Sequence, residues 1–466
     1  MNIIPTVHSI QYMKIVKKIH TTIVNKHFLS LSGNVIMSGL GLMIMTLIYR
    51  SLSKFDAGVW FFFQSILLLV DSIRSGFLTT AFIKFYAGSD EDRRAEVAGS
   101  SWYIGLMITG ILILISLSSI FYLNYIGDEG IVLFFKWSGL YYAVSLPWFL
   151  ASCVIQGEQK FDRFLYLRLS NQGSFTVFVV TLIIIGKATL SSILYAYLLS
   201  NFITSVFALS KGWTSVSTIR SKTWKTIVEI YHFGKYSVGS SLSSNMFGTS
   251  NAIIINFFLG KPALAIYNLG QSLMQLVEIP LRSFASTGMP SLAAAYNQGN
   301  RVEVIQIMKK YSGMITVFLI PAALIGILFA DAPIYFIGGG KYVGTEAANV
   351  FRIFLIFSIL APPERFFALT LDIIHKPHVN FYKVLIMLVV NVAADLLGYY
   401  LTRDIYGISF LTFLPTMVGA LIGFWALNQY YKFSYWSIFQ VGYHESVNAI
   451  RQAVGKHKPS ENPILP

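Results

Sequence analysis

Two pairs of opposite charge lie inside long apolar segments of this chain. Asp71 and Arg74 are three residues apart, and Glu278 and Arg282 are four apart, so each pair shares one face if its segment is helical. A charge at the centre of a bilayer costs on the order of 3 kcal/mol on insertion scales. These side chains should therefore face each other or water. The pairs indicate either a polar cavity within a membrane bundle or internal ion pairs that only tie helices together.

Small polar residues mark two further apolar segments. Ser241 and Asn245 lie in a stretch of five serines at 237–245, and Asn34 lies among serines and a glycine at 30–38. Such residues either allow helices to pack closely or line a wet cavity. Both interpretations remain open.

Other charges within apolar segments, Glu364, Arg365 and Asp395, are expected to be buried and could bind ions. Glu364 and Arg365 directly follow the pair Pro362-Pro363, which removes two backbone donors and bends a helix. This site could be a hinge, a cation site or an ordinary kink. Asp395 shares a helical face with an asparagine four residues earlier, and it could bind a proton or sodium ion or pair with a neighbouring helix.

The second half of the chain repeats the first. At an offset of 207 residues, 64–97 and 271–304 have ten of thirty-four residues identical, and Asp71 aligns with Glu278. Because both copies are apolar, the repeat predicts a duplicated membrane bundle. Internal duplication is common in transporters, whose substrate lies between the copies.

Composition predicts an all-α integral membrane protein. The chain is 55% hydrophobic and only 12% charged, about half the charge of a soluble domain. Helices are expected because a backbone exposed to lipid must satisfy its own hydrogen bonds. The predicted spans are 28–50, 58–83, 101–123, 132–154, 165–186, 190–210, 236–258, 264–288, 311–330, 348–374, 381–401 and 405–430.

The basic residues predict the orientation. Most Lys and Arg residues fall in segments on one side, which the positive-inside rule assigns to the cytoplasm. This distribution explains the net charge of +14 without nucleic acid as a partner. With six spans per half, the halves enter from the same side and are related by an axis along the membrane normal. The predicted parts are a cytoplasmic N-terminus at 1–27, an N-lobe at 28–210, a cytoplasmic linker at 211–235, a C-lobe at 236–430 and a cytoplasmic tail at 431–466.

Several short motifs, in order along residues 28–430, resemble those of polysaccharide flippases of the multidrug, oligosaccharidyl-lipid and polysaccharide exporter superfamily. They are Ser32-Gly33-Asn34, Arg50-Ser51-Leu52, Gly58-Val59-Trp60, the stretch from Ile155 to Phe161, Ala265-Ile266-Tyr267, Pro290-Ser291-Leu292, and Ile337-Gly338 with Tyr342. The resemblance implies two six-helix lobes around a V-shaped cleft that opens alternately to each side.

The resemblance also implies a substrate and a place in the cell. The substrate would be an oligosaccharide on undecaprenyl pyrophosphate, flipped from the cytoplasmic to the outer leaflet of the bacterial inner membrane for O-antigen, lipopolysaccharide or other surface polysaccharides. Arg74 and Arg282 would contact the pyrophosphate, Lys84 would attract it, and the serines and asparagines would meet sugar hydroxyls. Membrane lipids and the polysaccharide polymerase machinery are the other expected partners. No cofactor, metal site or catalytic residue is expected.

Two alternatives remain. A multidrug exporter of the same superfamily would exchange organic cations for protons or sodium, often through an acidic residue in the first span, and 28–50 contains none. A membrane polysaccharide polymerase or ligase would carry a long outer loop, whereas the loops expected here are short.

Overall fold

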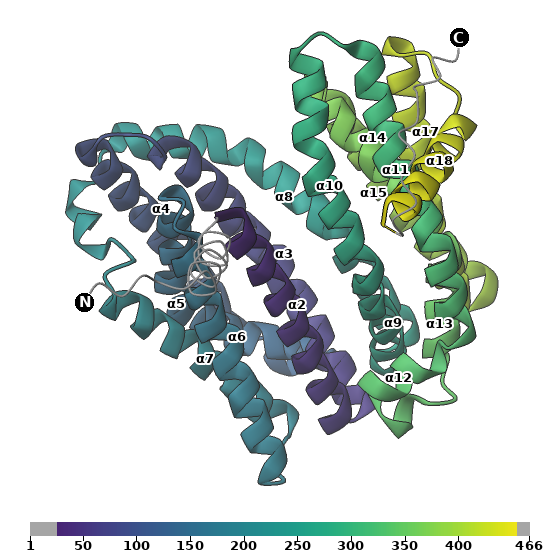
Figure 1. Cartoon of the computed structure of the whole chain (residues 1–466). Coiled ribbons are helices and arrows are strands. Elements are labelled where there is room, and N and C mark those ends of the chain that lie inside the picture. The colour runs from purple at the N-terminus through teal and green to yellow at the C-terminus, as the bar shows by residue number, and fades with distance from the viewer. Residues whose placement is uncertain (1–25, 454–466) are drawn as a thin grey trace, which may run out of the picture. The chain divides into compact units, whose positions relative to one another are not determined.

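The computed structural model describes residues 26–453, which form helices joined by short loops, without a strand in that range. The chain divides into two compact units, one ending at Asn245 and the other beginning at Met246. The first unit contains α2 (Lys26–Ser51), α3 (Lys54–Tyr86), α4 (Glu91–Ser119), η1 (Leu123–Tyr125), α5 (Glu129–Gly157), α6 (Phe161–Ile184), α7 (Leu190–Ser210) and η2 (Val216–Ser221). The long helix α8 (Trp224–Leu259) begins in the first unit and ends in the second (Figure 1).

The second unit is more segmented. It contains α9 (Lys261–Leu273), α10 (Gln275–Asn297), α11 (Arg301–Leu328), α12 (Asp331–Gly338), η3 (Gly340–Tyr342), α13 (Ala347–Phe357), η4 (Ser358–Leu360), α14 (Ala361–Ile373), α15 (Pro377–Thr402), α16 (Ile405–Leu411), α17 (Phe413–Tyr430) and α18 (Trp436–Ala453).

Each predicted span corresponds to one helix or to two consecutive helices. Within residues 26–453, nine helical stretches are long and apolar enough to cross a membrane. The predicted spans 28–50, 236–258 and 264–288 correspond to α2, α8 and the pair α9–α10. The prediction of an all-α, multi-pass membrane protein with about twelve spans is confirmed.

Three spans of the second unit are interrupted. The predicted span 264–288 breaks at Met274, and 405–430 breaks at Thr412. The span 348–374 breaks at η4, and Pro362 and Pro363 lie in the first turn of α14, which follows. Proline fits this first turn because its missing N–H would have no helical partner there. The two prolines therefore start a new helix after a break.

Polar caps fix where several helices begin. The side chains of Asp90, Asp128 and Asn300 accept hydrogen bonds from backbone N–H groups in the first turns of α4, α5 and α11. Thr189 and Ser192 form a capping box at the start of α7. These caps place short polar loops between the apolar helices.

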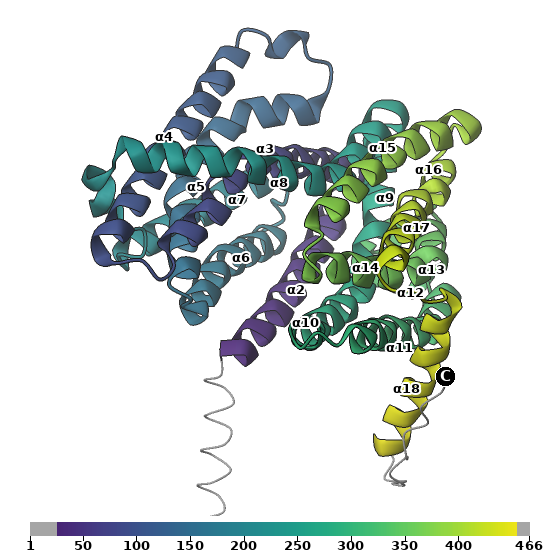
Figure 2. The same ribbon diagram turned by 90° about the horizontal axis from the view of Figure 1, so that it is seen from above.

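Each unit has its own hydrophobic core. In the first unit, buried residues of α3, α4 and α5 pack together with Ile230 from the start of α8. In the second, residues of α10, α11, α14 and α17 pack with Ile438 from α18. The predicted linker 211–235 packs against α4 through η2 and the start of α8. The predicted tail contributes α18, which packs against α11; both are labelled in Figure 2.

Candidate functional site

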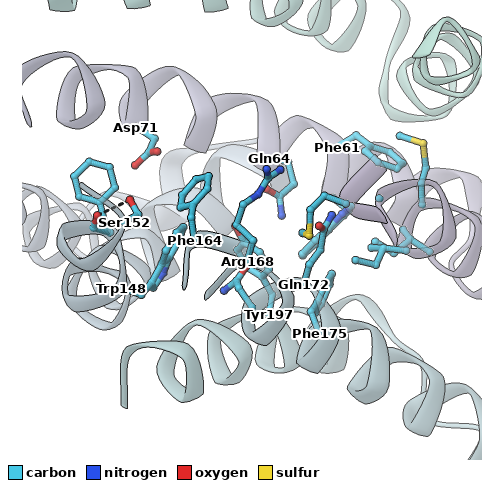
Figure 3. A pocket seen from close by; sticks show the side chains of 18 residues that line it. Phe61, Gln64, Asp71, Trp148, Ser152, Phe164, Arg168, Gln172, Phe175 and Tyr197 are labelled. Carbon is cyan, nitrogen blue, oxygen red and sulfur yellow. Dashed lines mark hydrogen bonds between the residues drawn. The ribbon is translucent and has the colours of Figure 1, made fainter. Parts of the chain in front are cut away.

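The first unit encloses a cavity of about 520 Å³ between α2, α3, α5, α6 and α7 (Figure 3). One part of its wall is aromatic, formed by Trp60, Phe61, Trp148, Phe149, Phe164 and Phe175. The polar part consists of Gln64, Asp71, Ser152, Arg168, Asn171, Gln172 and Tyr197. The cavity therefore combines flat apolar surfaces with amide, hydroxyl and charged groups.

The predicted pair Asp71 and Arg74 is brought together at this cavity. An Nη atom of Arg74 lies 2.7 Å from Asp71, and the other Nη donates a hydrogen bond to Ser145 at 2.9 Å. The guanidinium also lies over the ring of Phe149, 4.2 Å from its centroid. The Arg74 side chain is only 1% exposed, whereas the Asp71 carboxylate is partly exposed and lines the cavity. The buried guanidinium of Arg74 therefore fixes the position of the Asp71 carboxylate, which faces the cavity.

Residues of α6 supply most of the amides of this cavity. Arg168, Asn171 and Gln172 line it from one side, and Asn171 donates to the side-chain carbonyl of Asn201 at 3.2 Å. Trp148 donates to the same oxygen at 3.0 Å, which fixes its ring in the wall. None of these residues was among the candidates from the sequence. The sequence signal that could have identified them is that three polar residues fall within positions 168–172, inside the predicted span 165–186.

The second unit encloses a cavity of about 400 Å³ at the equivalent place in the repeat. Four of its lining residues are 207 positions after residues that line the first cavity. The equivalent pairs are Gly41 and Gly248, Ile44 and Asn251, Gln64 and Gln271, and Asp71 and Glu278. The duplication read from the sequence therefore extends to the position and part of the lining of a cavity in each unit.

The second charged pair is much more exposed than the first. Arg282 Nε lies 3.2 Å from Glu278, but the Arg282 side chain is 74% exposed. Its guanidinium is therefore open to an external group, unlike that of Arg74. The two pairs occupy similar places in the repeat but offer different chemistry.

A cluster of buried polar groups connects α8 and α15 beside the second cavity. Asn391 lies within hydrogen-bonding distance of Ser250 and Asn251, and the carboxylate of Asp395 is fully buried. Asn251 donates to Asp395 at 2.7 Å and accepts from the hydroxyl of Tyr267 at 2.8 Å when its amide is oriented to satisfy both. The sequence placed Asn391 and Asp395 on one face, but it did not identify Asn251 as their neighbour.

Glu364 and Arg365 differ in their surroundings. Glu364 forms an ion pair of 2.5 Å with Lys383, a residue of α15 that is fully buried. Arg365 is exposed, so the expectation that both residues are buried is wrong for Arg365. The partner Lys383 was missed because it lies at the end of a predicted span, where a basic residue usually reaches the polar interface.

The remaining candidates lie apart from the two cavities. Asn245 donates a hydrogen bond of 2.8 Å to Ser72 of α3, and Ser241 is half-buried. Lys84 is exposed near the end of α3, with its ammonium 4.0 Å from the ring centroid of Phe233. The side chain of Asn34 is outside the described residues.

Comparison with known proteins identifies the family. The family described as "Polysaccharide biosynthesis protein" matches residues 34–346. A probable low-salt glycan biosynthesis flippase of Haloferax volcanii is 22% identical over 402 residues, which is 84% of this chain and 80% of the relative.

Solved structures show the fold. The lipid II flippase MurJ in its inward closed conformation superposes with a TM-score of 0.72 at 13% identity, over 93% of this chain and 94% of that one. An inward-facing multidrug resistance transporter of the MATE family and MOP superfamily has a TM-score of 0.70 at 18% identity, over 84% of this chain and 94% of that one. The chain belongs to the polysaccharide biosynthesis protein family and has the fold of MOP-superfamily transporters.

Proposed function

We propose that this protein flips an oligosaccharide linked to a polyprenyl pyrophosphate, such as undecaprenyl pyrophosphate, from the cytoplasmic to the outer leaflet by alternating access. Family membership supports a transporter in polysaccharide biosynthesis. The observation that carries the substrate assignment is the composition of the first cavity, where aromatic rings face amide and carboxylate groups.

The first cavity suits sugar rings. A sugar has apolar C–H faces, which pack against aromatic rings, and hydroxyl groups around its edge, which need donors and acceptors. Trp148 and Phe164, which are partly exposed, offer such flat surfaces, while Gln64, Asn171 and Gln172 each carry both a donor and an acceptor. A volume of about 520 Å³ is within the usual range for small-ligand sites.

Arg282 is the better candidate for the pyrophosphate. Its guanidinium is exposed and can form two parallel hydrogen bonds to phosphate oxygens. Arg74 is buried among Asp71, Ser145 and Phe149, so we assign it the role of positioning Asp71. Lys84 remains a candidate for attracting the anionic carrier because it is exposed.

The buried cluster around Asp395 is our candidate for ion coupling. One carboxylate oxygen of Asp395 accepts hydrogen bonds from the amides of Asn251 and Asn391. One oxygen of Asp395 has no hydrogen-bond partner among the described residues, which suits binding of a proton or a sodium ion. Glu364 is less suited because Lys383 already neutralises it.

The charge balance of the first cavity favours this substrate over an organic cation. Asp71 is the carboxylate that lines the cavity, and the buried guanidinium of Arg74 neutralises its negative charge. Arg168 adds a positive charge to the same wall. A cation would therefore meet repulsion where a neutral or anionic glycan would not.

A reconstituted transport assay tests the proposal. Purified protein in vesicles should increase the fraction of a fluorescent polyprenyl-pyrophosphate oligosaccharide that becomes accessible to an added lectin. Trp148→Ala and Asn171→Ala should lower this rate, whereas Lys187→Gln, at an exposed loop residue that does not line the cavity, should not. Transport of an organic cation with no flipping of the glycolipid would overturn the proposal in favour of the multidrug exporter.

A further inference from the structure

One side of α18 carries exposed apolar side chains that no other described residue covers. Trp436, Tyr443 and Ile450 are seven residues apart, or about two helical turns, so they form one stripe. Ile438, Gly442 and Ser446 form the buried side. The third side is polar and exposed, with Gln440, His444 and Asn448. The helix thus has separate packed, apolar and polar sides.

The packed side of α18 is fixed against α11. Gly313 approaches α18 so closely that a Cβ added to it would lie 2.1 Å from the carbonyl oxygen of Ile438. Lys310 forms an ion pair of 2.6 Å with Glu445. Because Ile438 meets Gly313 and Glu445 meets Lys310, the two helices run in opposite directions. The end of the apolar stripe that contains Trp436 therefore lies level with the point along α11 where polar residues give way to apolar ones.

Chain connectivity also keeps α18 close to the membrane. The spanning stretch Ile405–Tyr430 ends only five residues before Trp436. Five residues can extend at most about 18 Å, so Trp436 must lie near the end of that span. An amphipathic helix in this position can meet the headgroup region of the bilayer.

The start of α8 repeats the same pattern in the first unit. Trp224, Tyr231 and His232 precede Trp436, Tyr443 and His444 by 212 residues each. Trp224 and Trp436 are both 73% exposed, and Tyr231 and Tyr443 are 54% and 58% exposed. The stretch Trp224–Lys235, which is amphipathic like α18, also follows the sixth helix of its unit.

The two segments pack on their units in a similar way, although the glycine contact in the first unit is made by η2, just before α8. Gly99 of α4 is covered by η2, where an added Cβ would lie 2.1 Å from the carbonyl oxygen of Thr218. Arg93 of α4 bonds to Thr226 at 2.7 Å and forms an ion pair with Glu229. In each unit, therefore, the segment after the sixth span packs on the third span and leaves a Trp–Tyr stripe outside.

Basic residues lie beside both stripes. Arg220, Lys222 and Lys225 are exposed between the end of η2 and the first turn of α8. Lys432 is exposed just before α18, and Arg451 is exposed in its last turn. Tryptophan and tyrosine prefer the interface of a bilayer, and basic side chains are attracted to anionic headgroups. A protein partner would have to match the same pattern on two separate units, whereas a membrane surface matches both.

We propose that α18 and residues 224–235 of α8 are interfacial helices that lie against an anionic phospholipid surface. Trp436, Tyr443 and Ile450 insert among the headgroups in one unit, and Trp224 and Tyr231 do so in the other. The basic residues bind lipid phosphates. Each helix holds the third span of its unit at a fixed depth. This role is independent of the transported substrate.

Lipid quenching of site-specific labels tests the proposal on the full chain. Cys153 is the single cysteine and is buried, so Cys153→Ala provides a background for Tyr443→Cys and Tyr231→Cys. Asn448→Cys and His232→Cys are matched controls on the exposed polar side of each helix. Each variant carries an environment-sensitive fluorophore in vesicles of phosphatidylcholine and phosphatidylglycerol.

Labels at positions 443 and 231 should be quenched several-fold more strongly by lipids spin-labelled near the headgroup than the control labels. The control labels should be quenched more strongly by aqueous iodide. Equal iodide quenching at both kinds of position would overturn the proposal. Protection from both quenchers would also overturn it, because a second copy or another protein would then cover the stripe.

The charge contribution has its own test. Lipid quenching at position 443 should increase when phosphatidylglycerol is added, and Lys432→Gln with Arg451→Gln should reduce that increase. Lys187→Gln should leave it unchanged. An increase that survives the double change would refute the role of the two basic residues.

Discussion

The guanidinium of Arg74 has all its nearby partners inside the first unit. It touches the carboxylate of Asp71, the hydroxyl of Ser145 and the rings of Tyr142 and Phe149. The hydroxyl of Tyr142 donates in turn to the backbone carbonyl of Leu67. Arg74 therefore connects α3 to α5 and sets the position of a carboxylate that lines the cavity.

Arg74→Gln should destabilise the protein by about 1–3 kcal/mol, because Asp71 loses its cation while the cavity only partly hydrates it. Thermal unfolding of the purified protein in detergent measures the loss. The double variant Asp71→Asn with Arg74→Gln should recover part of it. A double variant as unstable as the sum of the two single changes would show that the pair is not coupled.

Arg282 should behave in the opposite way. Arg282→Ala should leave stability nearly unchanged, since the side chain is 74% exposed. It should lower glycolipid transport roughly tenfold or more, because a bond to a charged group contributes about 1.5–3 kcal/mol. Arg282→Lys should restore only part of the rate, since lysine loses the planar fork.

The double variant Glu278→Gln with Arg282→Gln separates substrate binding from ion pairing. It should remain defective, because the phosphate still lacks its cation. Near-normal transport in this variant, at normal protein levels, would leave the pair with a structural role alone.

Asp395→Asn should abolish the response of transport to an imposed proton or sodium gradient. The amide keeps the shape of the carboxylate but cannot bind a proton or supply a negative charge. The measurement is the flipping rate with and without each gradient, with the exposed Asp92→Asn as the control. An unchanged gradient response in the Asp395 variant would exclude this residue from coupling.

At the scale of single residues, the sequence predicted which side chains are neighbours along one helix, but not which side chains are exposed. The spacing of Asp71 and Arg74 and of Glu278 and Arg282 placed each acid and base on one helical face, and an ion pair forms on each face. Which member of a pair faces solvent depends on the helices that pack beside it. The role of Lys383 could not be predicted for the same reason, because Glu364 lies on a different helix.

Packing of the third helix in each unit depends on a glycine. Gly99→Ala should destabilise the first unit by about 1–3 kcal/mol, because the new methyl group would overlap the backbone of η2. Gly110→Ala in the same helix is the matched control, since no atom lies within 4 Å of its added Cβ. That control should be neutral or slightly stabilising, because alanine favours helix more than glycine does. Equal effects on the unfolding temperature would show that η2 moves aside easily.

At the scale of elements, the apolar runs predicted the positions of the spans well. A span is recognised by the length of an apolar run, which can be read directly from the sequence. Breaks were less predictable. The sequence suggested a bend at Pro362-Pro363, and a break occurs there, but Met274 has no comparable signal.

At the scale of the whole molecule, the internal duplication relates sites in the first unit to corresponding sites in the second. The 207-residue repeat places Asp71 and Glu278 in corresponding cavities, and a 212-residue offset relates the two Trp–Tyr segments. The two units have nevertheless diverged at these sites. The first cavity has a carboxylate held by a buried arginine, and the second has an exposed pair beside a buried Asp395. We infer that the first unit mainly binds sugars and the second mainly senses the carrier phosphate and the coupling ion.

The orientation of the whole molecule can be tested by labelling from outside the cell. In the Cys153→Ala background, a membrane-impermeant thiol reagent should reach Lys341→Cys in η3 but should not reach Lys222→Cys after η2. The reason is the positive-inside rule, since position 222 lies in a segment rich in Lys and Arg whereas Lys341 is an isolated basic residue of its loop. Permeabilised cells provide the control, because both positions should then react. Labelling of position 222 in intact cells would reverse the topology, and the flipping direction proposed here would have to be reversed with it.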